Sequence, residues 1–176
     1  MACIQVTLGG LKHEGCGNIA GIKKAWLGVR KEFTIVPDYD DMSCTITPIG
    51  DAKIYEYEFP RETGSITSTM TKNVDNNNYY YTTDVVLQFN RLSARKHVEV
   101  QALAAGQLFG IFLDGNEEYH VVGIDSYITA TDQTAETGTS FDDANHYSTT
   151  LQERSGHLPC FTTYEAFKTY IGDTQE

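Results

Sequence analysis

The sequence lacks any apolar run close to the roughly 20 residues that a membrane-spanning helix requires. Its first six residues also lack the basic and apolar regions of a secretory signal peptide. We therefore expect neither a membrane span nor a membrane partner. With 176 residues and an apolar fraction of 40%, the chain is long enough to fold as one domain, residues 1–176.

Basic residues are scarce. Thirteen Lys and Arg residues stand against 24 Asp and Glu residues, and the formal net charge is −11. Tight binding to a nucleic-acid backbone needs clustered cations, so this balance disfavours it. The charge favours a soluble surface, or one that must not adhere to polyanions.

Cysteine is also sparse, and its four positions form no C-x-x-C pair: Cys3, Cys16, Cys44 and Cys160. This dispersion predicts reduced thiols made in a cytosol. His13 and Cys16 have a spacing compatible with a metal, but a site needs three or four ligands. An ordinary loop histidine and a buried thiol explain the pair better, so we expect no metal and no cofactor.

Catalytic motifs are missing as well. A Cys–His nucleophile would need Cys16 or Cys160 beside a distant histidine, and no local motif supports that grouping. No glycine-rich loop has the context of a phosphate site. The acidic stretches 37–41 and 114–118 are interpreted as a solvated loop and a turn, because the second lacks the spacing of a calcium loop. The sequence therefore predicts a protein that is not an enzyme.

Residues 79–125 carry the clearest signals of secondary structure, with few residues between one predicted element and the next. Residues 79–89 are aromatic and β-branched, which predicts a half-buried strand. Four of its side chains fall on one face: Thr83, Val85, Leu87 and Phe89.

A helix is predicted to follow directly. Ser93 offers an N-cap hydroxyl, and residues 94–105 contain neither Pro nor Gly. Gly106 stands where a left-handed residue would end the helix. The expected buried positions are Val98, Ala102 and Leu103.

Apolar stretches at 108–113 and 118–124 flank a turn signal and predict a hairpin. The core is thus expected to be one helix laid across a mainly antiparallel sheet. Further strands are predicted over 21–29, 44–49 and 147–151, and helical spacing over 162–171 predicts a short C-terminal helix.

Polar segments make up much of the remainder. Residues 52–59 alternate, so that Glu56 and Glu58 oppose aromatic neighbours, which predicts a strand with one wet face. Residues 65–72 are predicted to form a polar or edge strand, with a hairpin connection over 73–78. Residues 129–143 are interpreted as a polar arm, either a long loop or a segment that orders against a partner.

Three stretches together resemble the tail tube proteins of bacteriophages. They are residues 16–27, with a Gly-Ile-Lys followed by an aromatic; the central unit from Val85 to Gly123; and residues 137–151, a Gly-Thr-small-Phe segment before a strand. The sequence departs from the pattern at His146, where Gly is expected, and in the acidic stretch 37–41. These departures leave open a tail hub, an adaptor or another ring component.

The resemblance implies a β-sandwich or small β-barrel, largely antiparallel, flanked by one helix. It also implies self-assembly into rings, usually hexamers, that stack into the tube of a virion tail assembled in the host cytoplasm. Other phage tail proteins would be partners, and DNA only a transient passenger. A soluble binding module of unrelated role is the alternative.

Contact and channel residues follow as expectations. Open strand edges and polar tips normally require a neighbour, so residues in two segments are candidates for inter-subunit or inter-ring contacts: Asn76, Asn77, Asn78, Thr137, Thr139 and Phe141. The channel wall must repel phosphates, and Glu56 and Glu58 are its expected lining.

Overall fold

The computed structural model describes residues 10–11, 19–140 and 142–172. Two sheets account for most of the chain. The larger has seven strands: β1 (Ile22–Val29), β2 (Phe33–Asp38), β3 (Ser43–Pro48), β4 (Tyr55–Tyr57), β7 (Leu108–Asp114), β8 (Tyr119–Val122) and β11 (Cys160–Thr162). They lie in the order β2-β3-β11-β8-β7-β1-β4, and all pairs are antiparallel except β11 with β3.

The smaller sheet has four strands: β5 (Ser65–Asn73), β6 (Asn78–Asn90), β9 (Thr129–Glu136) and β10 (His146–Ser155). Their order is β5-β6-β10-β9, and every pair is antiparallel. Both sheets are open, so the mainly β fold is a sandwich and not a closed barrel.

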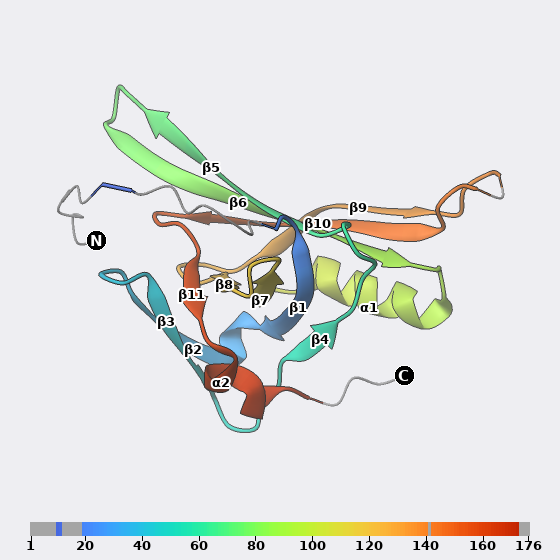
Figure 1. The fold of residues 1–176 in the computed structure, drawn as a ribbon, viewed down its shortest axis with the longest axis horizontal. Coiled ribbons are helices and arrows are strands. Elements are labelled where there is room, and N and C mark those ends of the chain that lie inside the picture. The colour runs from blue at the N-terminus through green and yellow to red at the C-terminus, as the bar shows by residue number, and fades with distance from the viewer. Residues whose placement is uncertain (1–9, 12–18, 141, 173–176) are drawn as a thin grey trace.

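Helices are few. The helix α1 (Ala94–Ala105) lies beneath β9 and β10, and α2 (Tyr164–Phe167) lies against the far side of the larger sheet (Figure 1). Short 3-10 turns occupy Arg30–Glu32 and Lys168–Tyr170. No helix in the described ranges is long and apolar enough to span a membrane.

The strand β7 explains why the core has two layers. Its residues Leu108–Leu113 are buried on both faces, as expected for a strand in which apolar and polar residues do not alternate. Leu108 and Phe112 join the layer between the two sheets, which also contains α1. Phe109, Ile111 and Leu113 join the layer on the opposite face, beside Trp26 and Phe167.

The predicted central unit is confirmed in most respects. Thr83, Val85, Leu87 and Phe89 are the buried face of β6, and the Ser93 hydroxyl accepts a hydrogen bond from the Lys96 amide at the start of α1. The predicted hairpin is β7 and β8.

Three details of the helix prediction were wrong. Val98 is 67% exposed, Ala102 is exposed, and Val100 is buried beside Leu103 instead. Gly106 is extended rather than left-handed, with φ −80° and ψ 148°. The helix therefore ends without a left-handed glycine cap, and β7 begins two residues after Gly106.

Other boundaries also differ. The alternating segment 52–59 forms a strand only at Tyr55–Tyr57, because Ile54 instead bonds through its amide and carbonyl to Tyr170 and Gly172. The segment 129–143 is not a long loop, since its first part is the strand β9. The C-terminal helix is confirmed as short, with one turn at α2 and a 3-10 turn after it.

Candidate assembly surface

The four-stranded sheet presents a polar face that the body does not cover. Cross-strand pairs show which side chains share it, because paired residues lie on one face of an antiparallel sheet. Its members are hydroxyl, amide and charged side chains with few apolar ones: Thr67, Thr69, Thr82, Asp84, Val86, Gln88, Ser148, Thr150, Gln152, Arg154, Asp132, Thr134 and Glu136. Three carboxylates share this face with one guanidinium.

Both edges of this sheet are open among the described residues. The strand β5 pairs only with β6, and β9 pairs only with β10. Each edge therefore carries a row of backbone groups able to pair with another strand.

One end of the sheet extends beyond the body. The pairing of β10 with β6 ends at Ser155 and Tyr81, whereas β5 and β6 continue as a two-stranded hairpin (Figure 1). We call residues 70–81 the finger. Asn76, Asn77 and Asn78 lie at its exposed tip, where the Asn73 side chain accepts hydrogen bonds from the Asp75 and Asn76 amides.

One face of the finger continues the core face of the sheet. Met70, Lys72, Tyr79 and Tyr81 lie on the same side as the buried Thr83 farther along β6. Met70 is 53% exposed, and Tyr79 and Tyr81 form an edge-to-face pair with ring centroids 6.1 Å apart. This apolar face, with a single cation, has no covering layer among the described residues.

The connection between β9 and β10 projects from the opposite end of the same sheet (Figure 1). The Asp143 carboxylate organises it by accepting hydrogen bonds from the amides of Ser140 and Thr139 and from the Thr139 hydroxyl. These bonds lower the pKa of Asp143. Thr137 and Thr139 lie here, and Phe141 falls outside the described residues.

The predicted channel residues lie elsewhere. Glu56 is on β4, at an edge of the seven-stranded sheet, and Glu58 follows it. Glu56 accepts a hydrogen bond of 2.5 Å from the Lys24 ammonium, which raises the pKa of Lys24. The structure thus does not bring these glutamates onto the same sheet as β5, the other polar strand.

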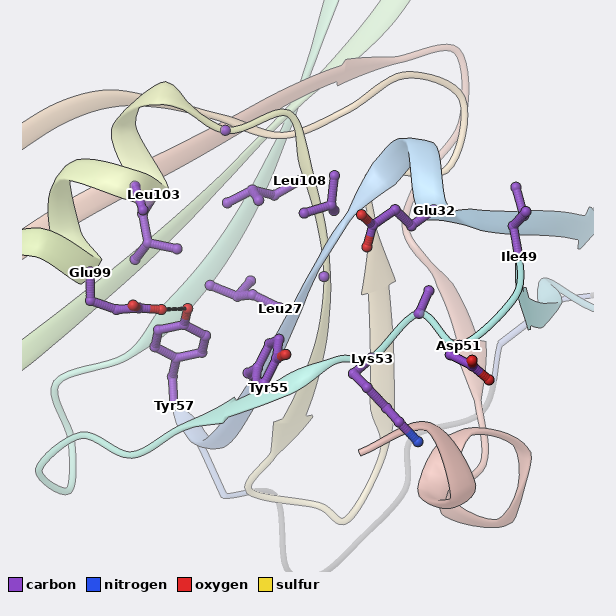
Figure 2. Close-up of a pocket in the computed structure, with 15 residues that line it drawn as sticks. Leu27, Glu32, Ile49, Asp51, Lys53, Tyr55, Tyr57, Glu99, Leu103 and Leu108 are labelled. Carbon is purple, nitrogen blue, oxygen red and sulfur yellow. Dashed lines mark hydrogen bonds between the residues drawn. The ribbon is translucent and has the colours of Figure 1, made fainter. Parts of the chain in front are cut away.

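A groove opens between α1 and the edge of the seven-stranded sheet (Figure 2). Its volume is about 550 Å³, and its apolar lining comes from Leu27, Val29, Ile49, Leu103 and Leu108. Three carboxylates, those of Glu32, Asp51 and Glu99, also line it, together with one ammonium group, that of Lys53.

The Tyr57 hydroxyl donates a hydrogen bond to Glu99 across the groove, and burial together with this bond raises the pKa of Tyr57. No sequence motif indicated this groove, because its walls come from distant segments.

Glu153 and Arg30 hold the loop that connects the two sheets by hydrogen bonds to its backbone. The chain passes from β8 to β9 through residues 123–128, and the Glu153 carboxylate accepts a hydrogen bond of 2.7 Å from the Gly123 amide. From the other side, Arg30 donates to the carbonyls of Ile124 and Ser126 at 2.9 and 3.2 Å. The loop is therefore held through both its donors and its acceptors.

Glu153 is expected to make stability fall as pH rises. It is only 4% exposed, and burial raises its pKa above the ordinary 4.5, with Asp125 adding to the effect and the Gly123 amide opposing it. The pKa of Glu153 is higher in the folded state than in the unfolded state, so the free energy of unfolding falls as the pH rises from 4.5 to the raised pKa. In urea unfolding measured over this pH range, Glu153→Gln should reduce the fall in stability. The same change at the exposed Glu136, Glu136→Gln, should not. An unchanged slope in Glu153→Gln would contradict the assignment.

Among the described residues, no group of three or more His, Cys, Asp or Glu is placed to hold a metal. Cys44 and Cys160 are buried free thiols, and burial raises their pKa values to about 12 and about 11. His13 and Cys16 lie outside the described residues. Comparison with protein-family models, curated proteins and solved structures gave no match.

Proposed function

We propose that this chain is a structural subunit that assembles with itself into rings, and that stacked rings form the DNA conduit of a bacteriophage tail. The observation that carries the proposal is the four-stranded sheet, with two open edges and a polar face. The resemblance of the sequence to tail tube proteins supports the same function.

Strand direction favours closure through these edges. The four strands alternate in direction, so β5 and β9 at the two edges run antiparallel to each other. When β5 of one copy lies beside β9 of the next, the alternation continues across the boundary. The contact joins different surfaces of the two copies, and such head-to-tail contacts generate rings when the rotation closes.

The polar face would then line the channel. Its carboxylates, Asp84, Asp132 and Glu136, outnumber Arg154, so the wall would repel DNA phosphates. Glu56 and Glu58 remain the competing lining, in a ring closed through the seven-stranded sheet. A wall that repels phosphates suits a DNA conduit, because DNA bound to the wall would not pass through completely.

The two projecting ends suit stacking. The finger tip, with Asn76, Asn77 and Asn78, leaves one end of the sheet, and the connection with Thr137 and Thr139 leaves the other. When sheet edges join copies within a ring, strand ends face the rings above and below. A tail hub or adaptor would use the same lateral contacts without continuous stacking.

A pair of variants at Ser65 tests the lateral contact. Ser65 is exposed on β5 and lies in the cross-strand row that runs through Val86 and Thr150 to Asp132 of β9. In a ring closed without stagger, Ser65 of one copy therefore lies opposite Asp132 of the next. Ser65→Glu is expected to weaken assembly, because like charges across paired strands are destabilising, whereas Ser65→Lys should preserve it.

The measurement is size-exclusion chromatography with negative-stain imaging over a concentration series. Rings or tubes from the parent and from Ser65→Lys, with smaller species from Ser65→Glu, are the expected result. A parent that remains a 19.6 kDa monomer at every concentration would refute the proposed function and favour a monomeric binding module.

A further inference from the structure

The groove and the finger have complementary properties. The groove combines an apolar lining with three carboxylates and one lysine. The uncovered face of the finger combines Met70, Tyr79 and Tyr81 with Lys72. Apolar surfaces of this kind are normally covered by a partner, and here the charges also have opposite sign.

The two features cannot meet within one copy. The finger projects from one side of the body, while α1 and β4, which border the groove, lie on the other side (Figure 1). The strands that carry the finger are continuous with the packed sheet, so the finger cannot fold back onto the groove without breaking their pairing with β10.

We propose that the finger of one copy docks in the groove of a second copy, with its aromatic face against the apolar lining and Lys72 beside the carboxylates. This contact rests on the self-assembly proposed above and adds a second interface to it. Glu32 and Asp51 are the partners of Lys72, because Glu99 already accepts from Tyr57.

The size of the groove is compatible with this occupant. A volume of about 550 Å³ lies within the range of roughly 300–1,000 Å³ that is typical of ligand sites. Aromatic side chains bury a large apolar area and dominate interface energetics. The tyrosines would therefore supply most of the affinity, and Lys72 would fix the orientation.

Reversing charges tests the orientation. Lys72→Glu should raise the concentration needed for half-assembly about two- to fivefold per contact, as expected for an exposed ion pair. Combining it with Glu32→Lys and Asp51→Lys should restore assembly. Arg61→Glu, the same charge change outside the finger, is the control and should have little effect.

Site-directed disulfide formation tests the contact directly. Val74 is 81% exposed at the finger tip, and Ala102 lines the groove. A mixture of Val74→Cys and Ala102→Cys chains, with Cys3 and Cys16 replaced by Ser, should give a covalent dimer that neither chain gives alone. Because this readout needs only two copies, it does not depend on ring closure.

The outcomes separate the two proposals. Rings without the mixed dimer, and without an effect of Lys72→Glu, would overturn the docking and leave the ring subunit intact. A mixed dimer without rings would support the docking and count against the conduit. Cross-links from Ala102→Cys to another surface, with none to Val74→Cys, would assign a different occupant to the groove and overturn the proposal.

Discussion

Replacing Leu103 by Asp is expected to lower the free energy of unfolding by roughly 3–5 kcal/mol, because it buries an unpaired charge. Leu103 is 3% exposed and packs in the layer between the two sheets. The loss should appear in urea unfolding followed by the fluorescence of the buried Trp26.

Val98→Asp is the matched control on the same helix. Its side chain is mostly exposed, so the change should stay within about 0.5 kcal/mol. An equal loss in both variants would show that Asp destabilises α1 through helix propensity and not through burial. Equal stability of Leu103→Asp and the parent would contradict the assignment of Leu103 to the core.

If the chain forms the proposed rings, lysines on the polar face of the four-stranded sheet are expected to convert them into DNA-binding particles. Asp84 and Gln88 lie on β6, at the middle of that face. Changing both to Lys raises the net charge by three per chain, in every copy around the proposed channel. Counterion release should then produce DNA retention that falls steeply with salt.

Glu56→Lys with Glu58→Lys is the competing variant, and it raises the net charge by four per chain. If the four-stranded sheet lines the channel, this larger change should give less retention of DNA passed over immobilised rings. The reverse ranking in a salt series would place β4 at the channel and contradict closure through β5 and β9. Negative-stain images of both variants check that rings remain.

The sequence predicted those elements whose own side chains determine them. The alternation of β6 identified its buried face, and Ser93 marked the start of α1. Which face of α1 is buried was harder to predict, because Val98 and Val100 are equally apolar. Packing in the folded protein determines that Val100 is buried, and Gln133 of β9 also donates a hydrogen bond to the Val100 carbonyl.

Long-range pairing caused the other errors. The strand β9 has no large apolar residue, so residues 129–136 resembled a loop, yet its pairing with β10 orders it. The alternation of residues 52–59 was real, but contacts of Ile54 with the C-terminal segment shortened the strand. The finger tip was predictable from its asparagines, whereas the groove was not, because α1 and β4 come together only in the fold.

The length of β6 has a mechanical consequence. One continuous strand of 13 residues serves both the finger and the packed sheet. A pull on the finger along its axis would load the pairs of β6 with β10 in shear, all together, instead of opening them one at a time. Ten such pairs tie the strand to β10, so a neighbour that grips the finger would transmit tension into the body without peeling the sheet apart.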